Sequence, residues 1–327
     1  MRRPFKDKRP IGPLFGQSSA DTIQSRLTSG VREDIGFEEG GSVKVYFHSS
    51  TNMDELKNGE IALFVTSPPY NVDYTYGSIN DAKPYREYMS LLAKVFSEAY
   101  NKLMPEGRLC VNVPTIDKTN ADAMGEGNIP VASDLTSMMV DDPSLGNKFS
   151  TPEINELKRT TDYSLFDHII WNKGRFDTEV NLGSLGIGRP FRFEHDITHE
   201  SILIFQKPGM RNLSTIDQDR LNASRLNKDW WTSGPGYEFD TNAKSNLWNI
   251  RPSNKIEVNG EKVPTFPEEL PRRLIQGYSF VGDIVVDPFA GVGTTLKVAK
   301  DLDRLSVGYE LREDLRPEIE KRVGESV

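Results

Sequence analysis

The chain has 327 residues, a formal net charge of −8 at pH 7 and one cysteine. This length can bury a sizeable core and fits one large domain with insertions. The acidic balance argues against a protein that coats nucleic acid by charge alone. Cys110 cannot form an internal disulfide or a multi-cysteine zinc cluster, which fits a reducing compartment. No stretch approaches the roughly 18 apolar residues of a membrane span, and no signal-peptide core is present, so we expect a soluble cytoplasmic protein.

Apolar runs and helical stripes alternate along most of the chain. Residues 1–42 form a polar N-terminal arm, whose first thirty residues carry six Lys/Arg against two Asp and are typical of a tail. Strands are predicted at 43–47, 61–66, 108–113, 166–171, 201–206, 283–287 and 305–309, and helices at 84–103, 293–302 and about 312–322. This alternation predicts an α/β fold with a Rossmann-like, doubly wound, mostly parallel sheet.

Two polar segments interrupt the alternation inside the domain expected at 43–327. Residues 114–160 carry four Lys/Arg against eight Asp/Glu, so we interpret them as a partly mobile insertion that closes over the ligand crevice. Residues 207–245 interleave Lys/Arg with Trp230 and Trp231, which favours a target-recognition segment. The predicted catalytic half is then 43–113 with 161–206, and the predicted cofactor half is 246–327.

The stretch DPFAGVGTT, residues 287–295, lies between a predicted strand and a predicted helix. Its glycines allow a ligand to approach the backbone, and Glu310, nineteen residues after Gly291, can hold two ribose hydroxyls. A phosphate-binding P-loop is disfavoured because Thr295 stands where that loop needs lysine. A dinucleotide site is disfavoured because seventeen residues follow Glu310, too few for a second nucleotide-binding half. The pattern therefore predicts an adenosine-type cofactor.

The remaining strands of that sheet must come from the N-terminal part, so we expect a circularly permuted strand order. Ligands of open α/β sheets bind beyond the carboxyl ends of strands, which predicts that Ser67 and Asp287 are neighbours at one crevice. Pro68 and Pro69 fix the backbone and remove two donors, so nearby carbonyls become outward-facing acceptors. Tyr70 adds a ring that can stack on a base. These groups suit an exocyclic amine whose nitrogen becomes partly positive as it attacks.

The two motifs resemble the β-class amino-methyltransferases of DNA, in which the catalytic motif precedes the cofactor motif. Further similar stretches are IIWNKG, THESILIFQK, NLWNI and VPTFPEELPRRLI, at residues 169–174, 198–207, 246–250 and 263–275. The resemblance implies S-adenosyl-L-methionine as methyl donor and Ser67 with the Pro68 carbonyl at the target amine. It implies a cofactor site made of Asp287, Pro288, Phe289, Gly291, Gly293, Thr294 and Glu310, with Thr265, Phe266 and Pro267 nearby.

The resemblance also bears on the substrate. A serine at position 67 resembles the cytosine-N4 enzymes, whereas aspartate is typical of adenine-N6 enzymes, and both amines make the same chemical demand. An RNA methyltransferase, or a relative that binds DNA without catalysis, stays open as an alternative. One departure concerns the first strand, which is followed by Ser49 and Ser50 where relatives often carry an acid.

Double-stranded DNA, bound with its target base flipped out, and a cognate restriction endonuclease are the expected partners. Five basic residues of the irregular segments are predicted DNA contacts: Arg189, Arg192, Arg211, Arg225 and Lys228. Cys110 lies in an apolar strand, which disfavours the thiolate chemistry of cytosine-C5 methylation. His195 and His199 do not form a zinc-binding pattern, so we expect no metal.

Overall fold

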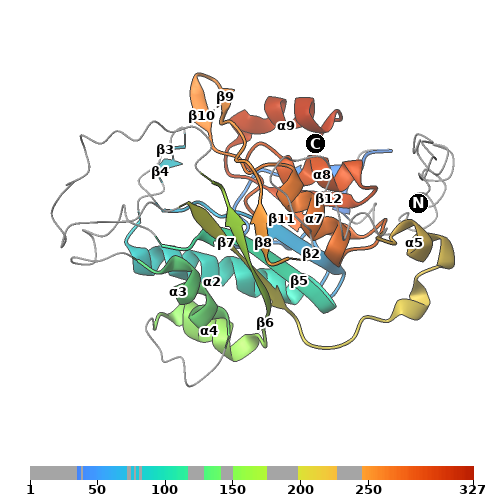
Figure 1. The fold of residues 1–327 in the computed structure, drawn as a ribbon, viewed down its shortest axis with the longest axis horizontal. Coiled ribbons are helices and arrows are strands. Elements are labelled where there is room, and N and C mark those ends of the chain that lie inside the picture. Colours follow the sequence, from blue (N-terminus) through green and yellow to red (C-terminus); the bar gives the residue numbers. More distant parts are fainter. Residues whose placement is uncertain are drawn as a thin grey trace, which may run out of the picture.

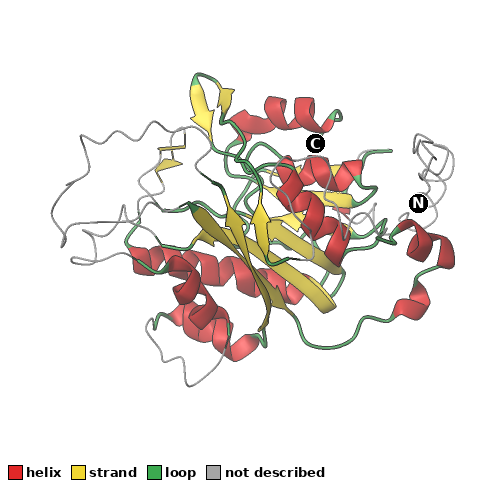
Figure 2. Ribbon diagram, in the orientation of Figure 1, coloured by secondary structure: helices red, strands yellow, loops and turns green. Residues whose placement is uncertain are grey.

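The computed structural model describes residues 35–37, 40–71, 75–76, 79–80, 83–116, 129–140, 150–174, 198–226 and 245–327. An eight-stranded sheet forms its centre (Figures 1 and 2). In spatial order the strands are β1 (Val43–Tyr46), β12 (Leu305–Tyr309), β11 (Ile284–Asp287), β2 (Ile61–Thr66), β5 (Leu103–Pro114), β7 (His199–Gln206), β6 (Ser164–Asn172) and β8 (Leu247–Asn249). All neighbours pair in parallel except β7, which is antiparallel to both β5 and β6. The prediction of a mostly parallel α/β sheet is confirmed.

The central strands are apolar because both faces of the sheet are covered. Every residue of β2, IALFVT, is buried, as expected for a parallel strand between helical layers. Successive side chains point to opposite faces. Phe64 therefore joins the cluster that contains α2 (Tyr85–Lys102), whereas Leu63 joins the cluster that contains α7 (Glu269–Tyr278) and part of α8 (Thr294–Asp301).

Helices thus cover both faces of the sheet. Helices α2, α3 (Val131–Met139) and α4 (Pro152–Thr160) lie on one face, and α7, α8 and α9 (Arg316–Val323) lie on the other. Smaller elements are η4 (Leu213–Thr215), α5 (Gln218–Ala223), η5 (Glu313–Leu315) and the two-stranded pairs β3 (Thr75–Tyr76) with β4 (Ile79–Asn80) and β9 (Ile256–Val258) with β10 (Glu261–Val263). Within the described part of the chain, no helix is long and apolar enough to cross a membrane.

The strand order is permuted in the expected sense. The connection β11–α8–β12 runs from the sheet centre toward β1, and β2–α2–β5 runs toward the opposite side edge. The direction of winding therefore reverses between the adjacent strands β11 and β2, where open α/β sheets bind their ligands. The first and last described parts meet at β1, where the Glu325 carboxylate accepts hydrogen bonds from the backbone N–H groups of Ser42 and Val43.

The described parts of residues 114–160 include two helices that belong to the core, while the closure of this segment over the crevice stays a prediction. Leu135 of α3 and Leu157 of α4 belong to the main core cluster, and α4 packs against α2. Helix α4 begins with Pro152 after a capping Thr151, whose hydroxyl accepts from the Ile154 N–H. These helices therefore form part of the layer beneath the sheet. Because the segment has an excess of acidic residues, the short apolar stripe of each helix was not recognised in the sequence.

Candidate functional site

The ends of β2 and β11 are joined by a buried hydrogen bond. The Thr66 hydroxyl donates to Oδ1 of Asp287 at 2.7 Å, and both residues are almost completely buried. Strand pairing places Phe64 opposite Val286, so both strands end at the same edge of the sheet. The predicted proximity of Ser67, which follows Thr66, to Asp287 is confirmed.

Three donors of the chain itself occupy the Asp287 carboxylate. Oδ1 also accepts the Phe289 N–H at 3.0 Å, and Oδ2 accepts the Thr295 hydroxyl at 2.7 Å. Burial raises the pKa of Asp287 to about 6, against the opposing effect of these hydrogen bonds. Asp287 thus shapes the turn that follows it, with Pro288 buried behind and Phe289 packed against the main core.

The glycine turn leaves room for a ligand. Gly291 has φ of +53°, and a Cβ built there would meet open space, so nothing of the described chain fills the position above it. Its N–H donates to Oε2 of Glu310 at 2.8 Å, and the Arg312 N–H donates to Oε1 at 2.9 Å. Burial raises the pKa of Glu310. Gly293, with φ of +78°, turns the chain into α8 close to Ile319. A carboxylate and a bare backbone thus lie together, as an adenosine-type cofactor requires.

The segment before α7 contacts the start of α8, next to the glycine turn. Oγ1 of Thr265 lies 2.7 Å from Oγ1 of Thr294, the first residue of α8. The Thr265 carbonyl accepts from the Ser253 hydroxyl at 2.5 Å. Phe266 and Pro267 follow, and the Pro267 carbonyl accepts the Leu270 N–H at the start of α7. The structure therefore brings Thr265 next to the glycine turn, although only the resemblance indicated it from sequence.

The sequence 67–70 lies directly beyond β2, on the opposite side of Asp287 from β12. Pro68 is buried, while Ser67, Pro69 and Tyr70 are partly exposed. The Ser67 hydroxyl donates to the Tyr70 oxygen at 3.0 Å, and the Tyr70 hydroxyl donates to Oε2 of Glu200 at 2.8 Å. Burial of this hydroxyl, followed by the nearby Glu200 charge, raises the pKa of Tyr70 well above its usual value. Tyr70 is therefore held by its hydroxyl end.

Three residues of this network escaped sequence reasoning as site residues: Asn112, Lys173 and Glu200. They come from β5, from the residue after β6 and from the start of β7, whose ends share the carboxyl edge with β2. Asn112 Nδ2 donates to the Tyr70 oxygen and to Glu200 Oε2, both at 2.7 Å, and Lys173 forms an ion pair with Glu200. The available signal was a glutamate at the start of an otherwise apolar strand.

Asn71 fixes the end of this stretch. It has φ of +59°, a left-handed conformation that asparagine adopts more readily than most residues, and it is 1 % exposed. Its side-chain amide donates to the Lys83 carbonyl and its oxygen accepts the Lys83 N–H, both at 2.8 Å. The two backbone points on either side of residues 72–82 are thereby tied together.

A carboxylate also lies near the end of β1, where Ser49 and Ser50 depart from the expected acid. Glu55 lies 2.8 Å from Nε2 of His48 and accepts from the Tyr309 hydroxyl at 3.2 Å. Ser49 Oγ lies 3.0 Å from Thr51 Oγ1, and Ser50 is buried. The acid beside the ends of β1 and β12 is thus supplied from a later position.

A family model described as DNA methylase, for N6 and N4 methyltransferases, matches residues 61–321. The chain belongs to this family. Among curated proteins, this DNA methylase is 27% identical to the type II methyltransferase M.MjaI of Methanocaldococcus jannaschii, covering 86% of this chain and 91% of the relative. It is 29% identical to the type II methyltransferase M.MthZI of Methanothermobacter thermautotrophicus, covering 87% and 77%.

Solved structures share the fold of the methylase. A protein described as a DNA modification methylase from Thermus thermophilus, complexed with S-adenosyl-L-methionine, superposes with a TM-score of 0.60 at 24% identity, covering 86% of this chain and 93% of that one. The PvuII DNA methyltransferase, described as cytosine-N4-specific, superposes with a TM-score of 0.53 at 17% identity, covering 85% of each chain.

The predicted DNA contacts of the methylase are only partly covered by the structure. Arg189, Arg192 and Lys228 lie outside the described residues, as does His195. Arg225 is exposed just after α5. Its neighbour Ser224 accepts the Val281 N–H, two residues before Asp283 at the start of β11. Arg225 therefore lies toward the amino edge of the sheet, opposite the edge that carries Ser67.

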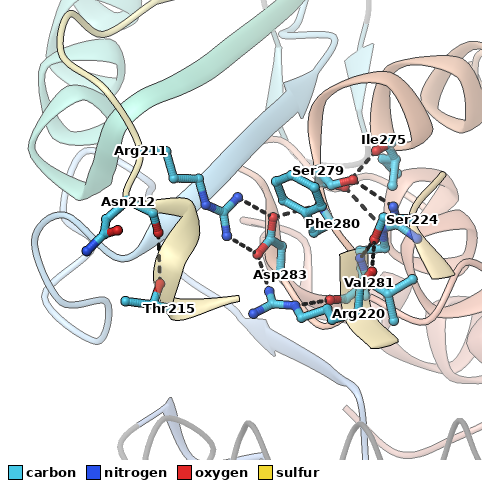
Figure 3. Close-up of polar contacts among 11 residues, drawn as sticks. Arg211, Asn212, Thr215, Arg220, Ser224, Ile275, Ser279, Phe280, Val281 and Asp283 are labelled. Atoms are coloured by element: carbon cyan, nitrogen blue, oxygen red, sulfur yellow. Dashed lines mark hydrogen bonds and ion pairs between the residues drawn. The ribbon is translucent and has the colours of Figure 1, made fainter. Parts of the chain in front are cut away.

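The guanidinium of Arg211 forms an ion pair within the chain. Figure 3 shows its guanidinium directed at Asp283, to which it donates two hydrogen bonds of 2.7 Å. Arg220 of α5 pairs with the same carboxylate and donates to the Val281 carbonyl. Arg211 is consequently engaged in a largely buried ion pair at the amino edge, and the described half of residues 207–245 is anchored there. The role of Arg211 as a contact to DNA stays a prediction, for a guanidinium that Asp283 already holds.

Two further sequence inferences concern chemistry other than amine methylation. Cys110 is buried within β5, and burial raises the pKa of its thiol, which opposes formation of a nucleophilic thiolate. Among the described residues, no group of His, Cys, Asp and Glu is arranged to hold a metal ion.

Proposed function

We propose that this DNA methylase transfers a methyl group from S-adenosyl-L-methionine to the exocyclic N4 of cytosine in duplex DNA. The observation that carries the proposal is the Thr66–Asp287 hydrogen bond, because it places the acceptor-rich turn after β2 beside the glycine turn after β11. The open space above Gly291 and the carboxylate of Glu310 fit the methyl donor. The complex of the Thermus thermophilus structure with S-adenosyl-L-methionine supports the same assignment.

When bound, S-adenosyl-L-methionine supplies a methyl group already activated by its sulfonium charge. The part of this chain is to hold the target amine in line with that methyl group and to stabilise the positive charge that develops on nitrogen. Ser67 and the Pro68 carbonyl accept the amine hydrogens, and the partly exposed Tyr70 ring offers a stacking surface for a flipped base. Asp287, Pro288, Phe289, Gly293, Thr294, Phe266 and Pro267 form the walls of the donor site.

The choice of cytosine N4 rests on Ser67 and on likeness to a structure described as cytosine-N4-specific. We further propose that the methylase acts at one recognition sequence within a restriction–modification system, in the manner that the type II names of M.MjaI and M.MthZI describe. Nucleoside mass spectrometry of DNA from a host that expresses the chain tests the first point, and N6-methyladenine would reassign the base. Sequencing of the modified bases gives the recognition sequence.

The mechanism is tested with Ser67→Ala. We expect methyl transfer to fall by roughly 10² to 10³-fold, the loss seen when one preorganised hydrogen-bonding group is removed from a catalytic site. The dissociation constant for S-adenosyl-L-methionine should stay nearly unchanged in calorimetry. Ser90→Ala is the matched control, because Ser90 lies on α2 and pairs with Thr151 away from the site. A Ser67→Ala rate equal to that of the control would remove Ser67 from the mechanism.

For DNA contacts we propose Arg189 and Arg192, because the flanking residues Gly174 and Thr198 lie at the carboxyl edge beside Lys173 and Glu200. Arg225 and Lys228 are retained as further proposed contacts to DNA. In Arg189→Ala/Arg192→Ala, the slope of log affinity against log salt should become shallower by about 2 if both neutralise phosphates. An unchanged slope would reject both contacts.

A further inference from the structure

A carboxylate that the reaction scheme above does not use lies beside Ser67. Glu200 opens β7 and is 5 % exposed. Lys173 contacts its Oε1 and supplies a countercharge. Oε2 accepts hydrogen bonds from Tyr70 at 2.8 Å and from Asn112 at 2.7 Å. A buried charge with this many partners costs desolvation energy, so its retention at the target-amine side of the site calls for a chemical reason.

The carboxylate dictates the direction of every hydrogen bond in the network. An ionised carboxylate only accepts, so the single hydroxyl hydrogen of Tyr70 must point to Glu200. The Tyr70 oxygen is then left as an acceptor, and it receives the single hydroxyl hydrogen of Ser67. Ser67 therefore has no hydrogen left to direct elsewhere. Its lone pairs are what it presents to the adjoining site.

The same argument fixes Asn112. Its amide nitrogen must face Glu200 and the Tyr70 oxygen, because the alternative orientation would set its carbonyl oxygen against a carboxylate. The Oδ1 atom of Asn112 is buried and has no hydrogen-bond partner among the described residues. A fixed direction thus leaves the Ser67 oxygen with one long contact of 3.5 Å from Asn112 Nδ2 and with room to accept a further hydrogen.

We propose that Glu200 is a positioning residue for methyl transfer: through Tyr70 it turns the Ser67 hydroxyl so that oxygen, and not hydrogen, meets the target amine. This inference rests on the proposed function of Ser67. Target-amine hydrogens need acceptors, and a hydroxyl free to rotate would present its own hydrogen part of the time. Lys173 balances the charge and holds the carboxylate in place.

Glu200→Gln tests the direction of the network at nearly constant shape. The Lys173 ammonium requires an acceptor, so the glutamine oxygen should face Lys173 and its NH₂ group should face Tyr70. This NH₂ group faces the Asn112 Nδ2 donor as well as Tyr70, so the Tyr70 hydrogen no longer has to point to residue 200. The Ser67 hydrogen is then free to turn to the amine. We expect the single-turnover methylation rate to fall by roughly 10²-fold, with affinities for S-adenosyl-L-methionine and DNA changed by less than about twofold.

Lys173→Met combined with Glu200→Gln provides the decisive comparison. Without the ammonium, the glutamine can rotate and offer its oxygen to Tyr70, so the original direction returns. The double variant should be at least about tenfold faster than Glu200→Gln alone, which a purely structural role of Glu200 does not predict because two buried partners are then altered. An equal or slower rate in the double variant overturns the proposal, as does a wild-type rate in Glu200→Gln.

Tyr70→Phe offers a second measurement that does not alter the ion pair. It removes the shorter link between Glu200 and Ser67 and leaves only the 3.5 Å contact through Asn112 Nδ2, so Glu200→Gln should cause little further loss in a Tyr70→Phe background. Additive losses would contradict positioning through Tyr70. The Ser67→Ala experiment distinguishes failure of the proposed function from failure of this inference. A wild-type rate in Ser67→Ala rejects the proposed role of Ser67. Loss of activity in Ser67→Ala but not in Glu200→Gln rejects only the role of Glu200.

Discussion

Two buried aspartates lie at opposite ends of the same short strand and are held in opposite ways. Asp283 precedes β11 and is 4 % exposed, while Asp287 ends β11 and is 2 % exposed. Asp283 is paired with the guanidinium groups of Arg211 and Arg220. Asp287 is held by two hydroxyls and one backbone N–H, all of them uncharged.

The difference fits two roles: Asp283 anchors a segment of the chain, and Asp287 shapes a turn next to the proposed cofactor site. At the amino edge, full charges compensate one another and anchor an irregular segment to the core (Figure 3). At the carboxyl edge, the Asp287 carboxylate accepts hydrogen bonds from uncharged donors of the described chain and shapes the glycine turn, while the Glu200–Lys173 ion pair lies at another place on the same edge. The contrast can be probed by altering each carboxylate.

The largest effect is expected from Asp283→Ala. It leaves two largely buried guanidiniums without their carboxylate, and breaking a buried ion pair costs about 3–5 kcal/mol. Urea unfolding measures the loss of unfolding free energy. Glu156→Ala removes an exposed pair with Arg159 on α4 and should leave the unfolding free energy nearly unchanged. Equal effects of the two substitutions would mean that Asp283 does not anchor this edge.

The next effect is a dependence on pH at Asp287. Its pKa is raised from 3.8 to about 6, so between these values the folded protein binds more protons than the unfolded chain. The stability that Asp287 contributes is therefore fully present below the unfolded pKa and is lost as pH rises to about 6. Above that pH, Asp287 no longer changes the unfolding free energy. Two pKa units correspond to about 3 kcal/mol.

Asp287→Asn isolates this contribution, because Glu310, whose pKa is also raised, is retained. Unfolding free energies of the wild type and the variant should be compared by urea titration from pH 4 to 8. The wild type should lose about 2 kcal/mol relative to Asp287→Asn between pH 4 and 6. A difference that does not vary with pH would show that Asp287 is not perturbed by burial.

The smallest of the three effects is expected from Thr66→Val. This nearly isosteric change removes a hydroxyl that donates to the buried Asp287, and hydrogen bonds to charged groups contribute about 1.5–3 kcal/mol. Thr136→Val is the control, since the Thr136 hydroxyl donates to a carbonyl of its own helix. Thermal unfolding should show a larger decrease in stability for Thr66→Val. A reversed order would indicate that the two strand ends are held together by packing alone.

The parallel core could be predicted because its strands are continuous apolar runs with distinct ends. Residues 61–66 and 305–309 were predicted with the bounds that the structure shows. The proximity of Ser67 and Asp287 followed from one rule, that ligand sites of such sheets gather at carboxyl ends. Only local pattern and topology were needed.

Other features depended on contacts between distant residues and had no local signal. Helices α3 and α4 lie in acidic surroundings, and their few apolar residues acquire meaning only against α2. Arg211 was predicted as a DNA contact because residues 207–245 interleave basic residues with Trp, and its ion pair with Asp283, 72 residues away, had no signal in the sequence. Lys173 follows β6 and Glu200, 27 residues later, is the second residue of β7, and the antiparallel pairing of the two strands brings them together.

The permuted order has a consequence for synthesis on the ribosome. Strand β1 emerges first, but its only strand neighbour in the described sheet is β12, which is translated about 260 residues later. Strand β2 likewise waits for β11 on one side. The nascent polypeptide thus carries an unpaired β-strand edge through most of its elongation, and we expect chaperone dependence to be concentrated in that interval.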